Sequence, residues 1–190
     1  MKSKRTFAPL VFAACLSSAA IAAAQDLVDF TIVDRVQFSV PGDWPVLANK
    51  STSDKTVFGF QIPNAADNGT SDSSNLSIIA TDLKTAQDKD AFQKQASSTD
   101  HNAQEKNLVE GWQCSTFSAV QRSSQTQYVI WDCHRIVADC GVSVRIAWPH
   151  LPKNPADYDK RMEELLSNFL TSVGPFKGVP KSGVLRRPVN

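Results

Sequence analysis

The histidines and cysteines of this chain are the side chains best suited to metal binding or nucleophilic chemistry. Cys133, His134 and Cys140 are close in the sequence, but they lack the two paired short spacings of structural zinc sites. Adjacent strand residues point to opposite faces, so Cys133 and His134 cannot readily share an ion. We therefore expect a disulfide with surface histidines, His101 and His150 among them, and no metal site.

The sequence does not indicate a catalytic nucleophile either. There is no Gly-x-Ser-x-Gly motif, and the serines fall in polar loops or on strand faces. Cys140 could be paired with His134 or His150, but an odd thiol in an exported protein is more often structural or oxidised. The acidic residues near the C-terminus fit the first turn and the exposed side of a helix: Asp157, Asp159, Glu163 and Glu164. We predict that the protein is not an enzyme and has no cofactor.

The polar segment 65–74 has oxygen-bearing side chains around a glycine. It lacks the ligand spacing and the terminal glutamate of a calcium-binding loop, so we interpret it as a surface loop. Together with a tryptophan that follows a turn, it forms a possible contact surface: Trp44, Asn64, Asp67, Asn68 and Asp72. The alternative for Trp44 is that it closes one end of a sheet.

The first 24 residues have the features of a cleavable secretory signal peptide. Lys2, Lys4 and Arg5 form a basic region, and the 18 residues from Phe7 to Ala24 are uncharged. The run ends in three alanines, the small residues that signal peptidase recognises.

Two alternatives to the cleavable signal are less well supported. The run is short and rich in alanine, with Pro9 and two serines, so it is poorly suited to a stable membrane anchor. Cys15 could be a lipoprotein site, but Phe12 is an unfavourable residue three places before it. We predict export to the periplasm or beyond, with no stable anchor after cleavage.

Cleavage changes the charge of the chain. It removes three of the 20 basic residues and none of the 19 acidic ones, which leaves a net charge of about −2. A nearly neutral chain without a long basic run does not favour nucleic acid as a partner. Residues 25–173 are enough for a single domain with a core, and the segment 174–190 contains several glycines and prolines typical of a flexible tail.

Alternating apolar residues predict the strands. The pattern covers residues 30–40, 56–62 and about 76–81, and then a meander of three strands across 111–149. Helical spacing predicts a mostly solvated helix over 86–98 and an amphipathic helix over 155–173. The fold class is therefore α+β, with an antiparallel sheet covered by helices.

The meander also predicts the disulfide. Two-residue loops at Ser123-Ser124 and Asp139-Cys140 would place Cys114 opposite Cys133 and Val137 opposite Val142. Directly opposed strand residues have Cβ atoms about 4.5–5.5 Å apart, near the separation of a disulfide. We therefore favour Cys114–Cys133 with Cys140 as the free thiol, and Cys133–Cys140 remains open if the second loop is wider.

The order of these elements resembles the PsbP/Mog1-like domains. The likeness spans roughly residues 28–173 and rests on the step Val40-Pro41-Gly42-Asp43-Trp44 and on the closing helix. It implies an antiparallel sheet covered by helices, and a domain that binds or chaperones other proteins rather than an enzyme.

These observations favour a periplasmic, non-catalytic domain that binds another protein, such as an immunity or accessory factor. The alternative is a periplasmic protein that binds a small ligand or a metal through the loop 64–75 or a cavity near Trp44.

Overall fold

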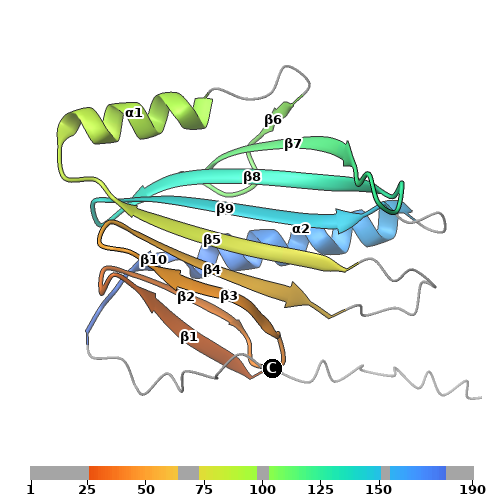
Figure 1. Cartoon of the computed structure of the whole chain (residues 1–190), viewed down its shortest axis with the longest axis horizontal. Helices are drawn as coiled ribbons and strands as arrows, with labels where there is room; N and C mark the ends of the chain where they lie inside the picture. The colour runs from red at the N-terminus through yellow and green to blue at the C-terminus, as the bar shows by residue number, and fades with distance from the viewer. Residues whose placement is uncertain (1–25, 64–72, 98–102, 151–154, 179–190) are drawn as a thin grey trace, which may run out of the picture.

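The computed structural model describes residues 26–63, 73–97, 103–150 and 155–178, in three layers (Figure 1). The main layer is a seven-stranded antiparallel sheet in the order β3-β4-β5-β9-β8-β7-β6, beside a three-stranded sheet in the order β1-β2-β10. Helix α2 lies behind the sheet in Figure 1, and α1 packs against the other face through Phe92, which lies over Gly141 of β9. The predicted α+β class, with a C-terminal meander covered by helices, is confirmed.

The strands and helices have the following bounds: β1 Leu27–Ile32, β2 Val36–Pro41, β3 Val46–Ser51, β4 Lys55–Ile62, β5 Ser74–Asp82, α1 Ala86–Ser97, β6 Gln104–Lys106, β7 Gln113–Val120, β8 Gln127–Val137, β9 Cys140–Pro149, α2 Pro155–Ser172 and β10 Gly174–Pro175. Neither α1 nor α2, the helices of the described residues, combines the length and hydropathy that a membrane crossing requires.

The face of the large sheet toward α2, called the inner face below, carries the core. One side chain of every two in β4, β5, β8 and β9 is buried against the apolar side of α2. Two hydrogen bonds fix the helix over this face: the Trp148 indole N–H donates to Asp159 at 2.6 Å, and the hydroxyls of Ser74 and Tyr158 are 2.9 Å apart. The predicted amphipathic helix is therefore the main cover of the core.

The segment predicted as one strand, 30–40, is instead a hairpin. Val33 and Asp34 both have positive φ, 46° and 54°, so the chain reverses there and β1 pairs with β2. The hairpin packs on the core through Phe30 and Phe38, whose rings contact Phe58 and Phe60 at centroid distances of 5.3–6.0 Å. The apolar alternation resumes in phase at Val36 after one polar residue, Asp34, which is why the pattern resembles a single strand.

The meander has the predicted faces but one register is shifted. β7 and β8 pair as predicted, with Cys114 opposite Cys133, although their loop has four residues, 122–125, in place of two. Between β8 and β9 the turn is Ala138-Asp139, so Val137 faces Cys140 rather than Val142. A shift of two residues keeps every side chain on its predicted face.

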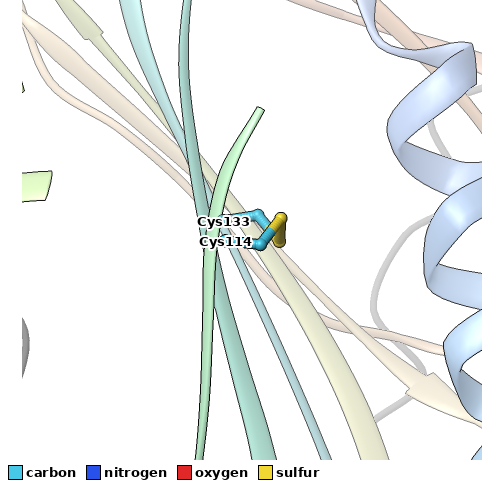
Figure 2. Close-up of a disulfide and its surroundings, with 2 residues drawn as sticks. All are labelled: Cys114 and Cys133. Atoms are coloured by element: carbon cyan, nitrogen blue, oxygen red, sulfur yellow. A yellow bond between two sulfur atoms is a disulfide. The ribbon is translucent and has the colours of Figure 1, made fainter. Parts of the chain in front are cut away.

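The predicted disulfide is present between Cys114 and Cys133, on the side of the sheet that faces α2 (Figure 2). Their Cα atoms are 4.1 Å apart. Cys140 is the free cysteine of the described residues, but it is buried in β9 and not in a turn as predicted. Burial raises the pKa of this thiol, an effect that the nearby Arg35 partly offsets.

Residues 174–176, predicted as the start of a flexible tail, belong to the fold. Gly174 and Pro175 form β10 and pair with β2, and the Phe176 N–H donates to the Arg35 carbonyl at 2.8 Å. The signal peptide predicted for residues 1–24 lies outside the described residues.

The Ala138-Asp139 turn generates the first prediction. Ala138 has a φ of 48°, a left-handed conformation that costs a non-glycine residue about 1–2 kcal/mol. Ala138→Gly should therefore raise the free energy of unfolding by about 0.5–1 kcal/mol in a urea titration. The control is Ala119→Gly in β7, where the backbone is extended and glycine should be destabilising by a similar amount. Equal destabilisation by both substitutions would contradict the strained turn.

Candidate functional site

Helix α1 is held on the outer face of the sheet, opposite α2, by one large apolar side chain. The ring of Phe92 lies over Gly141 of β9, where a Cβ atom would be only 2.6 Å from the Phe92 Cδ2. The rest of α1 is mostly exposed. The absence of a side chain at Gly141 thus creates the seat for the helix, and Phe92 takes part in the lining of two hollows beside it.

A capping box starts α1. The Thr85 N–H donates to the Asp88 carboxylate at 2.9 Å, and the Asp88 N–H donates to the Thr85 hydroxyl oxygen at 3.1 Å. Hydrogen bonds from the Thr85 side chain and backbone hold the pKa of Asp88 below its ordinary value, so this carboxylate is ionised where the helix dipole favours a negative charge.

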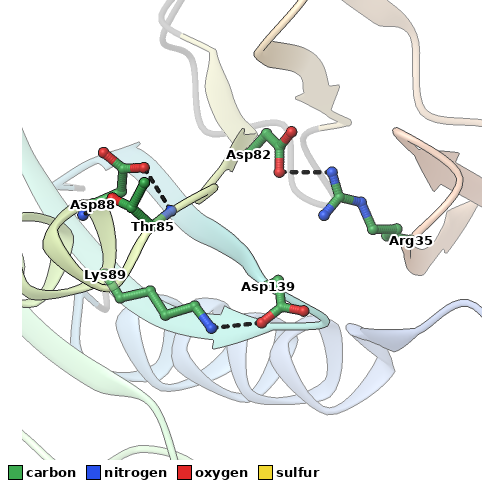
Figure 3. A network of polar contacts seen from close by, with 6 residues as sticks. All are labelled: Arg35, Asp82, Thr85, Asp88, Lys89 and Asp139. Carbon is green, nitrogen blue, oxygen red and sulfur yellow. Dashed lines mark hydrogen bonds and ion pairs between the residues drawn. The ribbon is translucent and has the colours of Figure 1, made fainter.

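Two ion pairs lie at the end of the molecule where α1 begins (Figure 3). Lys89 of α1 binds Asp139 of the β8–β9 turn at 2.6 Å, and this bond lowers the pKa of Asp139. Arg35 of the β1–β2 turn binds Asp82 at the end of β5 at 2.7 Å. The first pair joins α1 to the β8–β9 turn of the large sheet, and the second joins the small sheet to the large sheet.

A groove of about 540 Å³ lies between α1 and the outer face of the sheet. Its floor consists of side chains from β5, β8 and β9, and α1 forms one wall. Its lining includes the apolar and neutral polar side chains Ile79, Thr81, Ala91, Phe92, His134 and Ser143, and it carries charges of both signs at Lys55, Lys84, Asp54, Asp82 and Asp88. A smaller hollow of about 270 Å³ lies on the other side of Phe92.

His134 and Ser143 form the polar centre of the groove. They face each other across β8 and β9, and the His134 Nδ1 is 3.0 Å from the Ser143 Oγ. The His134 ring also meets Phe92 edge-on at a centroid distance of 6.0 Å. Burial lowers the pKa of His134, and the positive charge of Arg145 adds to this effect while Asp132 opposes it. The imidazole is therefore kept neutral at neutral pH.

The carboxylate nearest to this pair along β8 has a different partner. Asp132 accepts two hydrogen bonds of 2.6 Å from the Arg145 guanidinium. A serine–histidine pair needs a third group to orient the imidazole if it is to act as a nucleophile and base. The groove therefore offers hydrogen-bonding groups at His134 and Ser143 beside the apolar side chains of Ile79 and Phe92.

The structure places the sequence-predicted contact residues as follows. Trp44 is only 8% exposed and belongs to the core, so little of its side chain is available to a contact surface. Asn64, Asp67, Asn68 and Asp72 lie outside the described residues, as does His101. The His150 Nδ1 lies 3.7 Å from the Asp159 Oδ2. Cys133 forms the disulfide with Cys114. No cluster of metal-ligating side chains occurs within the described ranges.

Sequence reasoning missed the groove for two reasons. The predicted β8–β9 register placed His134 opposite Arg145 rather than Ser143, because it assumed a turn one residue further along. In addition, α1 has one large apolar residue, Phe92, and one residue does not define an apolar helix face that would pack on the sheet.

Comparison with solved structures identifies the fold. A protein of Bacteroides thetaiotaomicron VPI-5482 superposes with a TM-score of 0.51 at 14% identity, over 79% of this chain and 48% of that one, so this chain spans about half of its length. The Ran-binding protein Mog1p of Saccharomyces cerevisiae superposes with a TM-score of 0.50 at 11% identity, over 81% of this chain and 97% of that one.

The fold is Mog1/PsbP-like. No family model and no curated protein matches the sequence. The resemblance noted in the sequence is therefore confirmed at the level of the Mog1/PsbP-like architecture, in which both helices cover an antiparallel sheet.

The neutral state of His134 leads to a pH prediction. Its pKa in the folded chain is below the ordinary 6.5, so the unfolded chain takes up this proton first as the pH falls. The contribution of His134 to stability is present above the unfolded pKa and is lost on acidification. His134→Gln should therefore lose less stability than the wild type between neutral pH and about pH 5 in urea titrations. Equal losses would show that His134 is not the group that titrates.

Proposed function

We propose that this chain is exported to the periplasm and there binds another protein without catalysing a reaction. The signal-like N-terminus supports export, and a disulfide persists only where thiols are not kept reduced. In this role the protein is an accessory or immunity factor, which masks or stabilises its partner.

The observation that carries this proposal is the groove beside α1. Its lining combines apolar area from Ile79 and Phe92 with hydrogen-bonding groups at Thr81, His134 and Ser143, a mixture typical of protein-binding surfaces. A groove of about 540 Å³ with such a lining suits a segment of polypeptide.

The likeness to Mog1p adds support of a general kind. That protein is a Ran-binding protein, so the Mog1/PsbP-like fold serves protein binding in at least that case. From this likeness we take only the class of partner, which is a protein. The proposal that the groove is the contact rests on the residues of this chain alone.

Export can be tested on the intact precursor. We expect the protein recovered from the periplasmic fraction to begin at Gln25, as read by mass spectrometry. Leu10→Asp should keep the full-length chain in the cytoplasm, because it interrupts the apolar run. Wild-type protein that begins at Met1 in the cytoplasm would refute export, and a lipid-modified Cys15 would refute release from the membrane.

The contact site can be tested with a matched pair of helix substitutions. Ala91 is an exposed residue of α1 in the wall of the groove, and Ala156 is an exposed residue of α2 on the other side of the sheet. Ala91→Arg should obstruct the groove and abolish co-purification of a partner from periplasmic extract at low salt. Ala156→Arg should leave it unchanged.

Two results would contradict the proposal. Recovery of no partner by the wild-type protein would count against protein binding itself. Loss of the partner in neither variant would count against the groove as the contact.

A further inference from the structure

The edge of the large sheet at β7 is partly open. β6 pairs with β7 only from Cys114 to Thr116. From Phe117 to Val120, β8 is the only strand beside β7 in the part of the chain that the structure describes. Half of the strand therefore forms a sheet edge.

The hydrogen-bond pattern shows which groups are open. The Gln121 N–H donates to the Thr126 carbonyl at 2.9 Å, so these opposed residues form a hydrogen-bonded pair. Hydrogen-bonded and non-hydrogen-bonded pairs alternate along antiparallel strands. Phe117 and Ala119 therefore bond to β8, whereas Ser118 and Val120 direct their N–H and C=O groups toward the open edge. The short Cα–Cα distance of 4.1 Å between Cys114 and Cys133 fits this alternation, because it belongs to a non-hydrogen-bonded pair.

This edge lacks the features that usually prevent strand pairing. The opposite edge, β3, has a bulge between Val46 and Ala48 and carries Lys50, and β6 is three residues long with Glu105 and Lys106. Residues 117–121 contain no charge and no proline. Val120 is 57% exposed, which is high for an apolar side chain.

We propose that a second copy of this chain pairs with this edge, antiparallel, about a two-fold axis through Ala119. In that register Ser118 of each copy faces Val120 of the other, so all the open N–H and C=O groups of both strands are hydrogen-bonded. The two Ala119 residues meet at the axis, where their small side chains allow close approach, and Phe117 lies across from Gln121.

The geometry favours a second copy over an unrelated strand because the open stretch is its own complement. A two-fold axis brings identical surfaces together, so one uncharged edge is sufficient for a closed dimer. An axis one residue earlier, at Ser118, would require Thr116, and the edge at Thr116 is already occupied by Gln104 of β6. The axis at Ala119 uses the open residues without displacing β6.

The register can be tested by cross-linking the protein purified after export. Ala119→Cys should form a disulfide-linked dimer under mild oxidation, because opposed residues of a non-hydrogen-bonded pair have the spacing of a disulfide. Val120→Cys is the matched control. In the proposed register, position 120 of one copy lies two residues along the strand from position 120 of the other copy. The two thiols are then too far apart for a disulfide, so this variant should stay largely uncrosslinked. Cys140 is buried and should not contribute. Equal cross-linking of the two variants, or none of Ala119→Cys, overturns the register.

The dimer can be tested by sedimentation equilibrium. The mass should rise from one chain toward two between low and high micromolar concentration. Val120→Lys places a charge on the edge and should raise the dissociation constant by about tenfold or more. Leu47→Lys, on the opposite edge at 59% exposure, makes the same change in charge and should leave it unaltered. A chain that stays monomeric at high concentration, or equal effects of the two lysines, overturns the proposal. Binding of a partner in the groove is a separate measurement, so either result can fail alone.

Discussion

The register of the two central strands depends on the turn at Ala138-Asp139. Both residues adopt positive φ, which brings β8 and β9 together through a two-residue connection. This register places Gly141 beneath Phe92, and it places Ser143 opposite His134. The turn also contributes directly to α1, since Asp139 binds Lys89 and its carbonyl accepts the Leu83 N–H at 3.0 Å. Strain in two backbone residues is thus offset by contacts that position a helix.

The two faces of the sheet are packed very differently. On the inner face, α2 buries a row of apolar side chains, so any substitution there removes many contacts at once. On the outer face, α1 contributes the ring of Phe92 and, near its N-terminus, the charged side chains of Asp88 and Lys89. A helix with so few apolar contacts has a small local cost of displacement. The groove therefore lies where the structure can adjust to a bound segment with the least loss of packing.

The parts of the fold that a sequence could predict are those in which burial repeats with a fixed period. The meander and the amphipathic α2 follow from alternation and helical spacing, since each depends on which face a side chain occupies. The Val33-Asp34 turn interrupts the apolar alternation at one position, Asp34, and the pattern resumes in phase at Val36, so the β1–β2 hairpin was not predictable from alternation. The β8–β9 register failed for a related reason. Ala138 is an unusual residue at positive φ, and a shift of two residues leaves the pattern of faces unchanged.

The alternation of strand faces also explains why the candidate site was harder to predict than the core. A core residue needs only the correct face, whereas the His134–Ser143 pair needs the correct partner on the next strand. An error of two residues moves a partner by about 7 Å along the strand, which is too far for a hydrogen bond. The disulfide was predictable because the β7–β8 loop, although longer than expected, is centred on the same point, which preserves the pairing. Which residues face each other on neighbouring strands therefore depends on where the turn between the strands is centred. The sequence constrains that centre only weakly here, because neither turn contains glycine or proline.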